Sequence, residues 1–115
     1  MPPISIWTIT MVGKSQRHAD VEPAHPSELL GEVVIPATGK TNVEIAALLG
    51  VSRQTLYEVV AQKRSITPAM AVRLGKLFGN GPELWLNMQQ AYDLWHASEK
   101  LREEVKRIPT VRDAA

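Results

Sequence analysis

Four side chains with the chemistry to read nucleic-acid bases stand close together near the middle of the chain: Arg53, Gln54, Tyr57 and Glu58. In a DNA major groove, arginine pairs with guanine and glutamine with adenine through two hydrogen bonds each, while glutamate accepts one from cytosine. On a helix with about 100° per residue, the four side chains share one arc of about 140°. We therefore predict that Arg53, Gln54 and Glu58 read bases, with Tyr57 as a fourth member of the set.

The apolar residues of the same segment avoid this arc. We expect a helix from Arg53 to about residue 62, with Ser52 as its N-cap. On this helix Leu56, Val59 and Val60 fall opposite the polar arc, where they can pack on neighbouring helices. The polar arc is then left facing outward.

A shorter helix precedes this one. Thr41 and Glu44 have the spacing of a capping box, and the apolar positions that follow them end at Gly50. The brief connection between Gly50 and Ser52 gives the two helices the dimensions of a helix-turn-helix, whose second helix enters the major groove. The sequence therefore predicts binding to double-stranded DNA.

Residue types that hold phosphates surround the predicted base-reading set. Helix N-termini present free N–H groups to anions, and lysine or arginine supplies positive charge. The candidates are Thr41, Asn42, Ser52, Thr55, Gln62, Lys63 and Arg64. The alternative is that Thr41 and Ser52 act only as caps, that Arg53 and Glu58 form a solvated helix face, and that Lys63 and Arg64 are ordinary charged surface.

The charge distribution favours a polyanionic partner for this part of the chain. The whole protein has 13 basic and 12 acidic residues and a net charge of only +1. Residues 40–79 hold six basic and two acidic residues, an excess of four. A local basic field on a nearly neutral protein is where a polyanion would bind first.

Three further helices are expected to complete an all-α domain. One begins at Pro26 and ends before Pro36, whose ring and missing N–H oppose continuation. A second begins at Thr67-Pro68 and ends at Gly79. The last begins at Pro82. Its apolar residues recur at spacings of four, three and four, at Leu84, Met88, Ala91 and Trp95. A second, thinner apolar stripe extends further along, to Ile108. This helix is long enough to run beyond the core of the domain.

The first 24 residues differ from the rest. Residues 4–12 are β-branched and loosely alternating, which predicts either a short strand that needs a partner edge or a disordered tail. Residues 13–23 are polar and suit a linker. Translation that starts at Met11 is a further alternative.

Several functional classes are disfavoured. The chain has 115 residues, enough for one domain, and no cysteine for disulfides, thiolate metal sites or nucleophiles. His18, His25 and His96 lack metal-ligand spacing, and His25 suits a turn beside Pro26. We expect no catalytic site, no metal and no cofactor. No stretch is long and apolar enough for a bilayer, so we expect a cytoplasmic protein without membrane contact.

Several segments together resemble the HigA-type antitoxins, which belong to the phage-repressor-like (XRE) helix-turn-helix superfamily. The matching segments are His25–Glu28, Leu49–Leu56, Lys63–Ala71, Arg73–Leu74, Pro82–Gln89 and Tyr92–Trp95. The resemblance implies a five-helix, lambda-repressor-like domain at residues 25–96. Residues 1–24 form an N-terminal extension to it, and residues 97–115 form a C-terminal helical extension and tail.

The resemblance also implies function. Such a protein is a homodimer that binds a palindromic operator in its own promoter as an autorepressor. It also neutralises a cognate toxin, usually an mRNA-cleaving ribonuclease of RelE-like fold. The base-reading positions of related repressors fall on Arg53, Gln54 and Glu58.

The chain departs from the family pattern at two places. Asn42 stands where a longer glutamine is frequent, which puts its contact to phosphate in doubt. Ala61-Gln62 replaces a frequent Asn-Gly, so the residue that usually takes a left-handed conformation is missing. The second helix is then expected to run longer, or Gln62 to face DNA itself.

Two other functions stay open. One is an interaction protein whose toxin binding dominates, with weak or lost DNA binding. The other is a plain helix-turn-helix transcription regulator without a toxin. The aromatic residues Trp85, Tyr92 and Trp95 suit either a core or a partner-binding stripe, with Trp85 the best core candidate. The mixed charges of residues 99–107 suit a solvent-facing helix that could also dock on a second subunit or a toxin.

Overall fold

A computed structural model describes residues 21–111, and all the regular secondary structure in this part of the chain is helical, with no strand. The strand predicted at residues 4–12 lies outside the described residues. The first helix is continuous over α2 (Pro26–Leu29), the π-helical segment η1 (Leu30–Val34) and α3 (Ile35–Thr38). It is followed by α4 (Asn42–Leu49), α5 (Arg53–Val60), α6 (Pro68–Phe78), α7 (Pro82–Lys100) and α8 (Arg102–Lys106). The predicted all-α class is confirmed, with α8 as an additional short helix.

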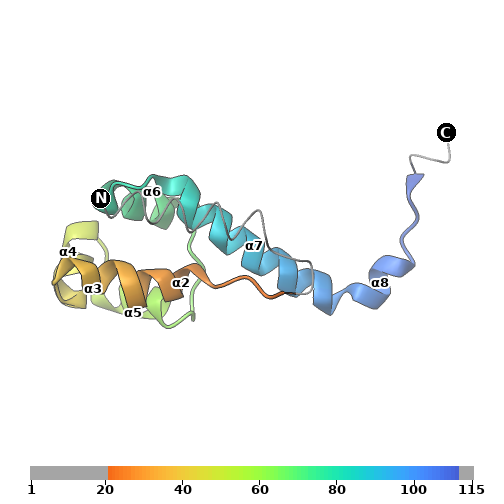
Figure 1. Ribbon diagram of the computed structural model, residues 1–115, viewed down its shortest axis with the longest axis horizontal. Helices are drawn as coiled ribbons and strands as arrows, with labels where there is room; N and C mark the ends of the chain where they lie inside the picture. The colour runs from red at the N-terminus through yellow and green to blue at the C-terminus, as the bar shows by residue number, and fades with distance from the viewer. Residues whose placement is uncertain (1–20, 112–115) are drawn as a thin grey trace.

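The helices form a small domain from which one long helix projects. The segments α2 to α5 lie together on one side, α6 packs against α4 and α7, and α2 contacts both α5 and α7 (Figure 1). α7 continues beyond the other helices toward α8 (Figure 1). Within residues 21–111, no helix has the length and apolar character needed to cross a membrane.

The first helix does not stop before Pro36, and that prediction is wrong. It continues to Thr38 and ends at Gly39, whose φ is 72°. The reason is the wider π-helical turn: the N–H of Ile35 bonds to the carbonyl of Leu30, five residues back. A π-turn shifts the hydrogen-bond register, so that Pro36 enters as one of the first residues of a new α-helical segment, where its missing N–H costs little.

The core lies between α2–α3, α4, α5, α6 and the start of α7. Trp85 is fully buried, as predicted, and its indole N–H donates to Oδ1 of Asn80 at 3.2 Å. The fully or almost fully buried aliphatic side chains include Leu30, Ile45, Leu56, Val59, Leu74 and Leu84. They come from η1, α4, α5, α6 and α7, so each of these helices has its apolar face covered by another helix.

α7 extends beyond this core, as predicted. Its buried residues are Leu84, Trp85 and Gln89, all in its first half, and α8 buries none. The helix is interrupted at Leu101, where φ is −101° and ψ is 13°. The apolar stripe predicted to extend to Ile108 therefore does not lie on one helix, because Leu101 is at the interruption and Ile108 follows α8; Leu94, Leu101 and Ile108 are all exposed.

Two buried polar residues join the first helix to α7. Nδ1 of His25 accepts a hydrogen bond from the N–H of Ser27 at 3.0 Å, which makes His25 the N-cap of α2 rather than a simple turn residue. The ring of Tyr92 packs edge-on against it, with centroids 4.6 Å apart. Oε1 of Gln89 accepts from the N–H of Ile66 at 2.9 Å, and its Nε2 donates to Asp93.

Acidification should destabilise the fold through His25. Burial lowers the pKa of His25 from its ordinary value of 6.5, against the opposing charges of Asp93 and Glu28. The unfolded chain therefore takes up the proton first, and the free energy of unfolding should fall as the pH drops below 6.5 and through the lower folded pKa. A proton on Nδ1 would also remove the acceptor for Ser27.

Urea denaturation across this pH range measures the effect. His25→Asn keeps an N-cap acceptor without a titrating ring, so its unfolding free energy should depend less on pH in this range. A variant with the same pH dependence as the parent would contradict the role of His25.

The approach of α6 to α7 requires a residue without a side chain at Gly75. A Cβ there would lie 2.3 Å from the carbonyl carbon of Gly81 and 2.5 Å from the nitrogen of Pro82. The backbone cannot easily withdraw, because the N–H groups of Gly79 and Gly81 both bond to the carbonyl of Gly75, at 3.0 and 3.3 Å.

Gly75→Ala should therefore lower the free energy of unfolding by about 1–3 kcal/mol, the usual cost of overpacking a core. Helix propensity alone predicts the opposite sign, because alanine favours a helix over glycine by about 1 kcal/mol. Urea denaturation decides between the two. Val72→Ala, on the exposed side of the same helix, is the control and should change stability by no more than about 0.5 kcal/mol.

Candidate nucleic-acid interface

The helix-turn-helix consists of α4, α5 and the three residues between them. Thr41 and Glu44 form the predicted capping box, with bonds of 3.2 Å from the N–H of Glu44 to Oγ1 and 2.8 Å from the N–H of Thr41 to Oε1. Oγ of Ser52 accepts from the N–H of Thr55 at 3.0 Å. Both predicted caps are confirmed, and each places a helix N-terminus at an exposed position.

The turn between the two helices depends on Gly50, which adopts a left-handed conformation with φ of 76°. Its N–H and that of Val51 bond back to Ala47 and Ala46 at 3.2 and 3.1 Å. These bonds satisfy two of the last carbonyls of α4, which have no partner within the helix.

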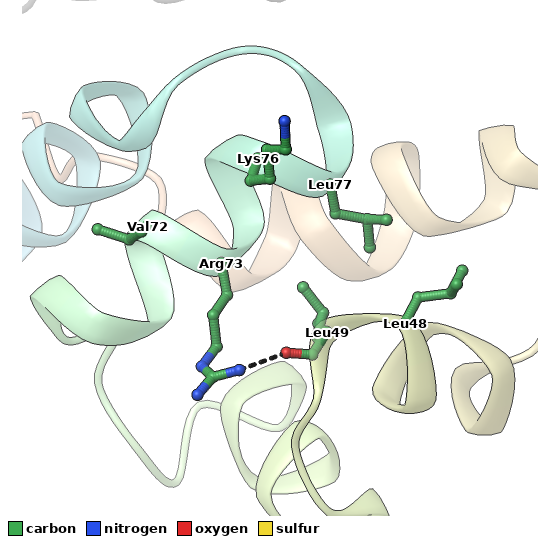
Figure 2. A pocket seen from close by; sticks show the side chains of 6 residues that line it. All are labelled: Leu48, Leu49, Val72, Arg73, Lys76 and Leu77. Carbon is green, nitrogen blue, oxygen red and sulfur yellow. Dashed lines mark hydrogen bonds between the residues drawn. The ribbon is translucent and has the colours of Figure 1, made fainter.

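Arg73 on α6 supplies a donor for another carbonyl at the end of α4. Its Nη1 donates to the carbonyl of Leu49 at 2.6 Å, and Figure 2 shows the side chain reaching from α6 to the end of α4. The guanidinium also lies close to Gly50, where a Cβ would be 2.9 Å from Nη1. A shallow groove beside this contact is lined by Leu48, Leu49, Val72, Arg73, Lys76 and Leu77 (Figure 2).

Sequence reasoning counted Arg73 in the local charge and assigned it no structural role. The available signal was the unpaired carbonyls at the end of a helix that stops at Gly50, which require donors from elsewhere. The residue that supplies one cannot be identified without the packing of α6 against α4.

α5 presents the polar arc outward, as the helical arithmetic predicts. Leu56 and Val59 are buried, with 1% and 0% exposure. Arg53, Gln54 and Tyr57 are exposed, and Tyr57 keeps 54% of its accessible surface. The structure therefore brings the proposed base-reading residues onto one solvent-facing side of α5.

Glu58 lies on this arc but is already bonded within the protein. Its Oε2 accepts from Nε2 of Gln54 at 3.0 Å, and its Oε1 accepts from Nε and Nη2 of Arg64 at 3.0 and 2.5 Å. The bond from Gln54, followed by that from Arg64, lowers the pKa of the Glu58 carboxyl, so it is ionised at neutral pH. Glu58 was predicted to contact a base and Arg64 a phosphate. In the structure the two side chains bond to each other instead.

Gln62 adopts the left-handed conformation itself, with φ of 63°, although it stands where the family frequently has Asn-Gly. α5 ends at Val60, so the expectation that it would extend to about residue 62 or beyond is wrong. The turn is held by bonds from the N–H of Gln62 to Val59 at 3.1 Å and from the N–H of Lys63 to Glu58 at 2.8 Å. These two backbone bonds offset the strain of a non-glycine residue at positive φ.

The predicted phosphate-binding residues lie at three places. Thr41 and Asn42 are at the start of α4, Ser52 and Thr55 at the start of α5, and Gln62, Lys63 and Arg64 follow α5. All except Thr55, which is partly buried, are exposed. Oγ1 of Thr55 accepts from Oγ of Ser52 at 2.8 Å, and Nζ of Lys63 lies 5.4 Å from the ring centroid of Tyr57.

Comparisons with known proteins agree with this architecture. A family model described as helix-turn-helix matches residues 37–86. An uncharacterized HTH-type transcriptional regulator of Escherichia coli, YbaQ, is 38% identical over 100 residues, which cover 84% of this chain and 88% of that protein. Antitoxin HigA-1 of Vibrio cholerae is 33% identical over 84 residues, which cover 73% of this chain and 79% of that protein.

A solved structure gives the same result. The Pseudomonas aeruginosa antitoxin HigA with the higBA promoter superposes with a TM-score of 0.73 at 28% identity, covering 78% of this chain and 99% of that one. The matches are regulators and antitoxins, which are not enzymes. The chain therefore belongs to the helix-turn-helix (XRE-type) family of transcriptional regulators that includes the HigA antitoxins.

Proposed function

We propose that this protein represses its own promoter by binding a palindromic operator as a homodimer, and that it neutralises a cognate toxin. The observation that carries the DNA-binding part is the geometry of α5. Its capped N-terminus and its polar side are exposed, while Leu56 and Val59 fix the opposite side in the core. The P. aeruginosa HigA solved with a promoter supports the same use of this domain.

In the proposed complex, two copies of α5 enter successive major grooves about 34 Å apart. Arg53 donates to guanine, and Gln54 pairs with adenine. Tyr57 lies beside them on the same side of the helix. Thr41, Asn42, Ser52, Thr55 and Gln62 contact the sugar-phosphate backbone and set the register, and Lys63 adds positive charge.

Binding to the protein's own promoter fragment and to scrambled DNA, measured across a salt series, tests this proposal. The promoter should bind far more tightly, with a steep dependence on salt. Arg53→Ala should cost about 1–3 kcal/mol and relax base preference at one position per half-site. Lys63→Ala should weaken both DNAs alike and reduce the salt slope by about 1.

The role assignments fail if Arg53→Ala and Lys63→Ala act identically on promoter and scrambled DNA. Equal, weak binding of the parent protein to both DNAs would favour an interaction protein in which toxin binding dominates.

We assign toxin binding to the C-terminal part of the chain. Leu94, Leu101, Val105 and Ile108 keep 65%, 42%, 52% and 66% of their surface exposed. No residue beyond Gln89 in α7 and α8 is buried, so these side chains do not stabilise the domain itself. An exposed apolar stripe on a helix is a common docking surface for another protein. The expected partner is a RelE-like, mRNA-cleaving toxin.

If a ribonuclease is encoded beside this gene, its capture by this protein tests the assignment. Leu94→Asp combined with Val105→Asp should abolish capture, because each carboxylate would be buried against the partner. Val72→Asp, on the exposed side of α6, is the matched control and should leave capture intact. Truncation after Trp95 should also abolish capture, whereas truncation before His25 should not. Capture that survives every C-terminal change would return the toxin surface to residues 25–96, and the absence of a neighbouring toxin gene would favour a regulator without a toxin.

A further inference from the structure

Two side chains on the polar side of α5 and one from the turn that follows it form a connected chain. Nε2 of Gln54 donates to Oε2 of Glu58 at 3.0 Å, and Arg64 donates twice to Oε1 of the same carboxylate. Each oxygen of Glu58 therefore has its own partner. The side chains of Arg64 and Glu58 are 52% and 26% exposed, so the carboxylate is the more covered of the two.

We infer that Glu58 is a positioning residue that fixes the amide orientation of Gln54, and thereby its preference for adenine, while Arg64 holds Glu58 in place. The inference rests on the proposed function, since it requires Gln54 to face a base. It changes the expected roles of Glu58 and Arg64. Neither acts chiefly through its own contact with DNA.

The amide of a free glutamine can present its oxygen and nitrogen in either of two orientations. An ionised carboxylate only accepts hydrogen bonds, so Glu58 excludes the orientation that would place Oε1 of Gln54 against it. Gln54 is then left with Oε1 as an acceptor and one N–H as a donor.

This remaining pair of groups matches adenine. Adenine offers the N6 amino group as a donor and N7 as an acceptor in the major groove. Guanine offers two acceptors, O6 and N7, and one of them would face Oε1 of Gln54 without a hydrogen. Fixing the amide therefore strengthens discrimination between adenine and guanine, without any contact between Glu58 and a base.

Arg64 is placed for this role by the turn at Gln62. The left-handed residue at φ 63° reverses the chain just after α5, so that a residue six positions beyond Glu58 reaches back to it. Its charge compensates a carboxylate that would otherwise repel DNA phosphates. The hydrogen bonds of this carboxylate go to Gln54 and Arg64. Nζ of Lys63 lies over the ring of Tyr57 instead, 5.4 Å from its centroid.

The test measures binding of the full-length protein to operators that carry each of the four bases at every position of the half-site. Gln54→Ala first identifies the base pair that Gln54 contacts. At that pair, Glu58→Ala should reduce discrimination between adenine and guanine about tenfold and leave the other positions unchanged. Glu58→Gln can donate as well as accept, so it admits either orientation of the Gln54 amide and should lose most of the discrimination as Glu58→Ala does. In a Gln54→Ala background, Glu58→Ala should have no further effect at that pair.

Arg64 and Lys63 provide a matched comparison. Arg64→Ala should weaken discrimination at the same base pair and leave the salt slope close to that of the parent. Lys63→Ala should reduce the salt slope by about 1 and leave base preference unchanged. The opposite result, with Arg64 changing only the salt slope, would identify Arg64 as a phosphate contact and overturn its part in the chain.

The remaining outcomes separate this inference from the proposed function. If Gln54→Ala removes base preference at one position and Glu58→Ala does not weaken it, the positioning role is wrong and base reading by α5 stands. If Glu58→Ala changes preference at a different base pair, Glu58 reads that pair directly and the inference is overturned. If Gln54→Ala changes no preference at all, both the inference and base reading by Gln54 fail.

Discussion

The orientation of α5 relative to α4 depends on the hydrogen bonds that satisfy the backbone carbonyls at the C-terminal end of α4. The carbonyls at this end have no partners within the helix, and three donors from outside it satisfy them. Two come from the backbone of Gly50 and Val51, and the third comes from Arg73 on α6. Gly50 is both left-handed and in close contact with the Arg73 guanidinium, so a side chain there would strain the turn and displace the arginine. α4, the turn and α6 are therefore held as one unit.

α5 is also fixed at its other end. Oγ of Ser27, in the first helix, donates to the carbonyl of Val59 in the last turn of α5. The loop that follows α5 is held by Gln89 through the N–H of Ile66. With Ser52 capping the first turn locally, both ends of this eight-residue helix are held. A short helix could not keep its exposed side chains in register by helix propensity alone, so these tertiary bonds supply the rigidity that base recognition requires.

Sequence patterns predicted the features that depend on neighbours in the chain. The capping box at Thr41, the cap at Ser52 and the burial of Leu56 and Val59 follow from spacing on a regular helix, and all are observed. The errors occur where the backbone leaves regular α-geometry. Pro36 is accommodated by a π-turn, and Gln62 by a left-handed turn that two backbone bonds stabilise. Neither is visible in a pattern that assumes 3.6 residues per turn.

In the candidate site, too, one side-chain contact could be predicted from helical spacing and another could not. The bond between Gln54 and Glu58 had a signal in the sequence, because residues four apart on a helix are neighbours. The partnership of Glu58 with Arg64 had none, because it depends on the conformation of Gln62. The local excess of four positive charges consequently overstates the charge left for phosphates. Arg64 is paired with Glu58, and Arg73 is held against the end of α4. The proposed DNA-binding surface thus uses part of its positive charge to fix the positions of other side chains, which favours selectivity over general affinity for a polyanion.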